Sequence, residues 1–338
     1  MSSLADVCDE PRRFRLPLLP LLVCAYAGVA AALRPDIYLR MVFSYTVQAV
    51  ELAPPLFLLG IGIAAALRGG QAPLRYLVTL VARRGPPLMA VIGLAVVGIA
   101  AFTTLKLSIT QFVPFWGDPF LLRLDKALHF GDPGLHLHAM LPDWFGGFIG
   151  VIYGPVWFTT WFGFIGAMAL HPDPQLRQRY FLTIALVFAL LGSLAATLFA
   201  SVGPLFYEHF FDATDYETLL ARIYSTPVGD YMQQARALLI ANYDAERPAM
   251  GTGISAMPSM HLAITTLNVL LLFRLNRIAG LVGCGFLALI QIGSVYLGWH
   301  YAVDGYASIV AVAVIWSLVG RLMTHSGEPA TARASASP

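Results

Sequence analysis

Tyr180-Phe-Leu-Thr-Ile-Ala-Leu-Val-Phe-Ala-Leu-Leu-Gly-Ser-Leu-Ala-Ala-Thr-Leu-Phe-Ala-Ser-Val202 is an apolar run without a single charged residue. A helix needs about 20 predominantly apolar residues to cross a bilayer. Backbone polar groups in hydrocarbon must be paired within their own segment, so a run of this length favours a transmembrane helix over a strand or loop.

Seven further runs of the same kind occupy much of the remaining chain. They are Leu16–Leu33, Met41–Leu67, Pro86–Leu105, Trp144–Leu170, Pro258–Phe273, Ile278–Leu297 and Asp304–Leu322. The whole chain is 58% hydrophobic and only 12% charged, whereas soluble domains carry about 25% charged residues. The sequence therefore predicts an all-α, polytopic membrane helix bundle with about eight transmembrane helices.

The basic residues predict how these helices are oriented. With eight spans, 13 of the 21 Lys and Arg residues fall on the side of the two termini, and this side is expected to be cytoplasmic. The opposite side holds 14 of the 19 acidic residues. We expect an integral protein of the cell inner or plasma membrane. Cleavage of the first apolar run as a signal peptide is an open alternative, since it follows Arg12, Arg13 and Arg15.

The segments between the runs differ in length. Two outer segments, 106–143 and 203–257, are long, and their many aromatic residues favour ordered pieces at the interface over disorder. The Ser-, Ala- and Pro-rich end, 326–338, is expected to be a disordered tail.

Two polar passages lie at the predicted outer ends of helices. The first is Gly251-Thr-Gly-Ile-Ser-Ala-Met-Pro-Ser-Met-His261, and the second is Tyr296-Leu-Gly-Trp-His-Tyr-Ala-Val-Asp304. Pro at the start of a helix, after a Gly- and Ser-containing run, predicts free backbone N–H groups that suit an anion. We expect Ser259 to lie in this phosphate site, although it could also serve as a helix cap.

The second passage predicts an oriented nucleophile. His300 and Asp304 are four residues apart, so the carboxylate can hold one ring nitrogen while the other attacks. His261 is then the candidate general acid for the leaving oxygen. Ionisable groups at membrane depth indicate function more often than structure, and we assign His300, Asp304 and His261 as catalytic.

These residues resemble the motifs of the type 2 phosphatidic acid phosphatase (PAP2) superfamily. Its Pro-Ser-x-His motif matches 258–261, and its His-x-x-x-Asp motif matches His300 and Asp304. The resemblance implies a six-helix catalytic core over 86–325. It makes 1–85 an addition consisting of a tail, two transmembrane helices and a cytoplasmic interfacial segment.

The family's first motif, Lys-x6-Arg-Pro, is absent here. Its place reads Phe199-Ala-Ser-Val-Gly-Pro-Leu-Phe-Tyr207, and Ser294 replaces the arginine usual before the nucleophile. This pattern is closest to the inositol phosphorylceramide synthase-like branch, which implies sphingolipid-type chemistry. Some cation must offset the phosphate; we assign Arg247 to substrate phosphate binding and keep Lys106 as an alternative.

The expected function is transfer of a phospho-head group from a phospholipid donor to a lipid or polyol hydroxyl through a phospho-histidine. A lipid phosphate phosphatase acting on phosphatidic acid or a prenyl diphosphate is the first alternative, and a non-enzymatic lipid transporter or scramblase is the second. We expect lipid substrates and the membrane as partners, with no nucleic acid. Oligomeric state is left open.

No metal or other cofactor is expected. The spacing of His129, Asp132, His136 and His138 matches no closed site, and the three cysteines are scattered. Glu208 and His209 are more typical of a loop surface than of a base for an acceptor.

Overall fold

The computed structural model describes residues 18–68 and 73–325, with side chains described only in part between 52 and 87. Within these residues the chain is helical and contains no strand. The predicted tail 326–338 and the arginines before the first apolar run lie outside this description. The long elements are α1 (Leu18–Leu33), α2 (Pro35–Arg68), α3 (Pro73–Leu107), α7 (Trp144–Val151) with η1 (Ile152–Val156) and α8 (Trp157–Ala169), α9 (Pro174–Leu186) with η2 (Val187–Ala195) and α10 (Ala196–Leu198), α14 (Met260–Leu275), α15 (Arg277–Tyr296) and α16 (Ala302–His325).

Each predicted apolar run coincides with one of these long elements. Among the described residues, five helical segments are long and apolar enough to cross a membrane: Leu88–Leu107, Trp144–Ala169, Pro174–Leu198, Arg277–Tyr296 and Ala302–Met323. Two further apolar helices, α1 and α14, are shorter. The prediction of an all-helical membrane protein is confirmed, and the total of eight spans stays a prediction.

Helix α14 lies at the centre of the bundle. It packs against α8, α9, α15 and α16, and every residue from Leu262 to Val269 is buried. A helix that is apolar all round is stable only when neighbours cover every face. The start of α14 is therefore held on several sides, and this is where the Pro-Ser-x-His motif lies.

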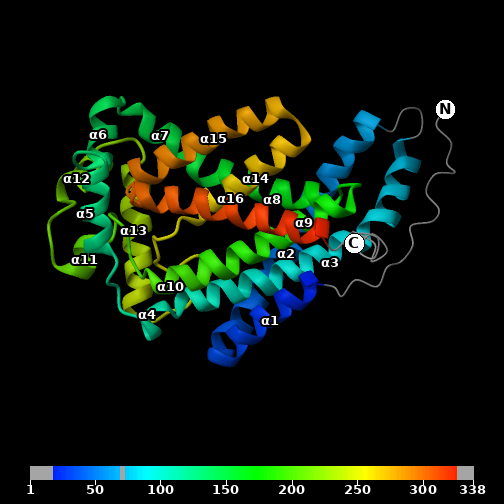
Figure 1. Ribbon diagram of the computed structural model, residues 1–338, viewed down its shortest axis with the longest axis horizontal. Helices are drawn as coiled ribbons and strands as arrows, with labels where there is room; N and C mark the ends of the chain where they lie inside the picture. The colour runs from blue at the N-terminus through cyan, green and yellow to red at the C-terminus, as the bar shows by residue number, and fades with distance from the viewer. Residues whose placement is uncertain (1–17, 69–72, 326–338) are drawn as a thin grey trace, which may run out of the picture.

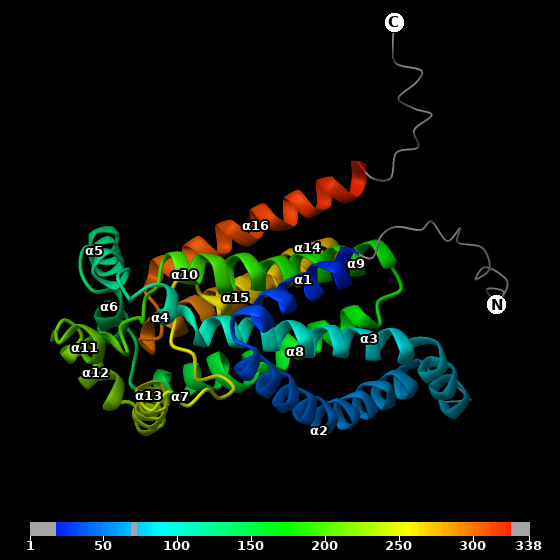
Figure 2. The same ribbon diagram turned by 90° about the horizontal axis from the view of Figure 1, so that it is seen from below.

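The first two helices pack beside this group, mainly on α3 (Figures 1 and 2). Ala27 and Ala30 of α1 meet Ala101 of α3 in one small buried cluster. In addition, the Tyr45 hydroxyl and Thr103 Oγ1 form a hydrogen bond of 2.8 Å between α2 and α3. These contacts fix α3, whose last turn reaches the region of the motifs.

The long outer segments contain short helices, which we call the cap. These are α5 (Asp118–Leu128), α6 (Pro133–Met140), α11 (Tyr207–Phe211), α12 (Glu217–Tyr224) and α13 (Gly229–Asp244), with the single turn α4 (Ile109–Phe112) beside them. The cap gathers at one end of the bundle, and α1 begins and α16 ends toward the other end (Figure 2). Helix α5 contacts α16, and α6 contacts α15, so the cap covers the turn that carries His300.

Candidate active site

The turn between α15 and α16 places His300 beside Asp304. The chain reverses at Gly298, whose φ of 72° suits glycine, and the His300 N–H donates to Ser294 O at 3.2 Å. His300 Nδ1 lies 3.3 Å from Asp304 Oδ2, which also accepts the Tyr301 N–H at 3.1 Å. A proton on Nδ1 pointing at this carboxylate leaves Nε2 with its lone pair, as a nucleophile requires.

Asp304 is completely buried, and His300 is only 8% exposed. Among the described residues, Asp304 Oδ1 has no hydrogen-bond partner. A buried carboxylate oxygen without a donor is costly. The arrangement is therefore better suited to a site that a substrate completes than to a static structural pair.

Ser259 brings the Pro-Ser-x-His motif against the His-x-x-x-Asp motif. Its N–H donates to Asp304 O at 3.4 Å, and the preceding loop is tied down because Ala256 N donates to Ser201 O and Met257 N to Ser201 Oγ. Ser259 is the residue before α14, yet its side chain forms no cap. Its hydroxyl is fully buried and, although the Tyr153 hydroxyl lies near it, forms no hydrogen bond of ordinary geometry among the described residues, so it is available to a ligand.

The His261 ring is sandwiched between two aromatic side chains. Tyr153 stacks on it at 4.2 Å with an interplanar angle of 11°, and Trp157 lies 3.9 Å away at 33°. The Trp157 indole N–H donates to His261 O and Thr265 Oγ1. The ring centres of His261 and His300 are 6.5 Å apart, so a histidine at the start of α14 and one in the turn between α15 and α16 lie close together.

A π-helical segment creates this sandwich. Within η1, Pro155 has no N–H to continue the α-helical ladder, and the locally widened turn precedes α8. Tyr153 and Trp157, both nearly buried, then contact the same ring. Such bulges occur frequently at functional sites.

Two buried aspartates of α5 hold in place the turn that carries His300. Asp125 accepts hydrogen bonds from the N–H groups of Ala302 and Val303, at the start of α16. Asp118 accepts from Val202 N, Gly203 N and the Tyr301 hydroxyl. The cap thus fixes the turn and the segment that replaces the family's basic motif.

Burial raises the pKa of both carboxyl groups. For Asp118, the N–H groups of Gly203 and Val202 and the Tyr301 hydroxyl oppose this rise. For Asp125, the N–H groups of Ala302 and Val303 do so first. Each carboxylate therefore depends on its donors to stay charged in an apolar setting.

Arg247 lies in the segment between α13 and α14, and its side chain is exposed. Its backbone N–H donates to Asn242 O. Within the described residues, no side-chain contact links Arg247 with Ser259, His261 or His300. Its assignment to phosphate binding stays a prediction.

The other candidate polar residues are engaged elsewhere. His129 contacts Asp125 and Tyr306, and His138 Nε2 lies 2.9 Å from Tyr296 O. His209 lies 3.3 Å from Asp244 within the cap. These side chains point to different partners and do not converge on one centre.

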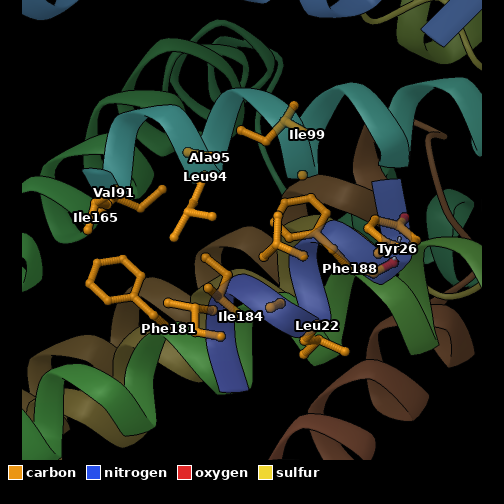
Figure 3. A pocket seen from close by; sticks show the side chains of 14 residues that line it. Leu22, Tyr26, Val91, Leu94, Ala95, Ile99, Ile165, Phe181, Ile184 and Phe188 are labelled. Atoms are coloured by element: carbon orange, nitrogen blue, oxygen red, sulfur yellow. Dashed lines mark hydrogen bonds between the residues drawn. The ribbon is translucent and has the colours of Figure 1, made fainter. Parts of the chain in front are cut away.

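Two pockets among the described residues bear on the site. A small one beside His300 is lined by residues of the cap that include Asp125, Asp132 and Tyr216. A larger one is lined almost wholly by apolar side chains of α1, α3, α8, α9 and η2 (Figure 3). Phe188 of the larger pocket packs on Trp161, which packs on Trp157; this aromatic row separates the pocket from His261.

Sequence reasoning missed Asp118, Asp125, Tyr153 and Trp157. A signal for the aspartates was available, because Asp118, Leu121, Leu122 and Asp125 share the helical spacing of one buried face. Two acids on an otherwise apolar face indicate buried partners. No comparable local signal marks Tyr153 and Trp157, whose role depends on where α14 packs.

Comparison with known proteins agrees with the geometry. A family model described as the PAP2 superfamily matches residues 119–318, which include both motifs and most of the cap. No curated protein and no solved structure matches the chain. The family match covers more than half of the sequence, and the chain therefore belongs to the PAP2 superfamily and is an enzyme of the phosphatase and phosphotransferase type.

Proposed function

We propose that the protein is an integral membrane lipid phosphotransferase that moves a phospho-head group from a phospholipid donor to a lipid or polyol hydroxyl. The observation that carries the proposal is the convergence of Ser259, His261, His300 and Asp304 from two separate passages. Ser259 N–H meets Asp304 O, and the rings of His261 and His300 lie close enough for one phosphoryl group between them.

The proposed reaction has two balanced steps. In the first, His300 Nε2 attacks phosphorus, the bond to the leaving oxygen breaks, and His261 gives that oxygen a proton. Asp304 stabilises the resulting positive charge on the imidazole without itself taking the proton. In the second, His261 accepts the proton of the incoming hydroxyl, whose oxygen displaces Nε2 from phosphorus. His261 must be protonated to begin the first step and neutral to begin the second.

Two observations favour transfer over hydrolysis. The cap covers the turn that carries His300, and Ser259, Asp304 and His300 are all buried or nearly so; exclusion of water protects a reactive phospho-histidine until an alcohol arrives. The family's basic motif is also absent. A phosphomonoester approaches two negative charges near neutral pH, whereas a phosphodiester carries one and needs fewer cations.

The inositol phosphorylceramide synthase-like branch, with a sphingolipid acceptor, is the finer form of this proposal. It rests on the motif pattern, in which Ser259, His261, His300 and Asp304 are kept while the basic residues are missing. A phosphatidylinositol-type donor and a ceramide or diacylglycerol acceptor are the substrates to try first.

The test offers three donors to the purified protein in lipid vesicles: phosphatidic acid, a prenyl diphosphate and a phosphatidylinositol-type lipid. Each is given with and without ceramide or diacylglycerol, and the lipid products are separated and identified by mass spectrometry. We expect a product that requires both the third donor and an acceptor. Rapid release of inorganic phosphate from the first two, without an acceptor-dependent product, would identify a lipid phosphatase instead.

A further inference from the structure

In the proposed reaction the four motif residues supply a positive charge to the donor only through protonated His261, and His261 loses that charge when it gives its proton to the leaving oxygen. Asp304 adds a negative charge to the site, and Ser259 is neutral. A phosphoryl group passing between His261 and His300 carries at least one negative charge in a buried setting, where an unpaired charge is costly. A cation from another element must therefore reach the site.

Lys106, in the last turn of α3, lies against the loop that leads to Ser259. Its stem runs along Gly253, in the passage that leads to the Pro-Ser-x-His motif. A Cβ at Gly253 would lie only 2.9 Å from Lys106 Cγ and 3.2 Å from Cδ. The missing side chain of Gly253 is what leaves room for this stem. The loop before α14 thus contacts the Lys106 stem at Gly253 and reaches Ser259 six residues later.

The ammonium group of Lys106 lies near a side chain that packs beside the start of α14. Nζ lies 5.9 Å from the centre of the Phe102 ring. Phe102 and Met260 meet at Gly192, where a Cβ would lie within 3.2 Å of both side chains. Met260 directly precedes His261 in the sequence, so the Phe102 ring next to the Lys106 ammonium group also packs next to the residue before His261.

Lys106 also lacks a protein counter-ion. Within 18–68 and 73–325, no described carboxylate lies at ion-pair distance from its Nζ and no hydrogen bond is formed there, whereas Lys126 pairs with Asp215 at 3.6 Å. A half-buried cation without a partner is unfavourable unless an anion joins it. The alternative is a lysine that merely extends its stem over apolar surface to reach the interface, and it predicts no role for the charge.

We propose that Lys106 binds the phosphoryl oxygens of the substrate and supplies the positive charge that the family's absent first motif would otherwise provide. The inference rests on the proposed function and deepens it. The positive charge then comes from Lys106 at the end of α3 and not from the segment after α10, where the family's first motif would lie. One lysine beside a helix start is matched to a phosphodiester with a single negative charge, in keeping with the proposed donor.

The test replaces Lys106 with Met, which keeps the apolar stem and removes the charge. Lys126→Met is the matched control, because it removes a lysine from the cap outside the site. With the phosphatidylinositol-type donor we expect kcat/KM to fall on the order of 100-fold for K106M, about tenfold or less for K106R, and not at all for K126M. Turnover of K106M equal to that of the unmodified protein overturns the inference and leaves the proposed function standing.

A second variant tests the geometry independently. Gly253→Ala places a methyl group against the Lys106 stem and should lower kcat/KM when Lys106 is present. In the K106M background the same change should have a much smaller effect, since no ammonium remains to displace; such non-additivity is expected of residues in contact. Equal losses in both backgrounds would contradict the proposed placement of Lys106.

A binding measurement separates the inference from the reaction. In His300→Ala protein, which should not turn over, a short-chain phosphatidylinositol is titrated while the thermal transition is followed. A stabilising shift that disappears in the H300A/K106M protein supports the anion site even if the unmodified protein transfers no head group, in which case the proposed function is wrong. A shift of equal size in both proteins, or in neither, overturns the role of Lys106.

Discussion

The Tyr301 hydroxyl donates a hydrogen bond to Asp118 Oδ1 at 2.9 Å and thereby joins two residues that are 183 positions apart. The same carboxylate accepts the N–H groups of Val202 and Gly203. One buried side chain therefore connects the cap, the segment after α10 and the turn that carries His300. The position of His300 depends on this junction as well as on the turn between α15 and α16.

Asp118→Asn should destabilise the protein and lower its activity. An amide keeps the shape of the carboxylate but turns an NH₂ group toward N–H donors, leaving buried groups unpaired at a cost of about 1–3 kcal/mol. Thermal unfolding in detergent and kcat measured on the same samples check this. Tyr301→Phe removes one donor only and should cost less, and the exposed Asp230→Asn is the control. Unchanged stability of D118N would refute the junction.

His300→Ala should abolish turnover and the acid-labile phospho-enzyme, because no nucleophile remains. Asp304→Asn should leave a measurable remainder, since orientation and charge stabilisation are weakened while the nucleophile stays. Labelled donor, rapid quenching and gel analysis give both quantities. A vesicle flip assay on H300A addresses the transporter alternative: lipid movement that survives loss of all turnover would favour a scramblase.

The distribution of basic residues predicts cytoplasmic termini and a cap on the outer side. Cysteine at Asp230 in α13 should react with an impermeant reagent from outside intact cells, and cysteine at Gln175, at the start of α9, only after the membrane is opened. Both positions are exposed. Cys8, Cys24 and Cys284 are first replaced by Ser. The reverse pattern of labelling would place the chemistry in the other compartment.

His138 should make stability depend on pH. Burial lowers its pKa, while the hydrogen bond to Tyr296 O works the other way. The unfolded chain then binds the proton more readily than the folded one, so stability is fully present above about pH 6.5 and is lost as the pH falls through the lower folded pKa. Thermal midpoints at pH 7.5 and 5.5 should differ more for the unmodified protein than for His138→Gln. An equal difference would assign the pH dependence to other groups.

Chelators should leave activity unchanged. In the proposed chemistry the nucleophile, the proton donor and the phosphate ligands are His300, His261, Ser259 and Lys106, and no step is assigned to a metal. Activity assayed after dialysis against EDTA should equal that of an untreated sample. Loss of activity that a divalent metal restores would contradict the phospho-histidine proposal.

The helices and the motif residues could be read from the sequence because both are local properties. An uncharged run as long as 180–202 has to pair its backbone within itself in a membrane, whatever its neighbours are. The spacing of His300 and Asp304 likewise brings their side chains together within one turn, as the 3.3 Å contact shows. Roles for Ser259 and His261 followed from their position at a helix start.

Packing alone decided which distant residues serve these motifs. Asp118 and Asp125 reach the turn that carries His300 only because the cap folds back over α16, and Tyr153 and Trp157 enclose His261 only because η1 lies beside α14. Lys106 meets Gly253 across the end of α3, while Arg247, closer to the motif in sequence, is exposed. Contacts between separate helices depend on which faces are buried together, and no local spacing of residues encodes that choice.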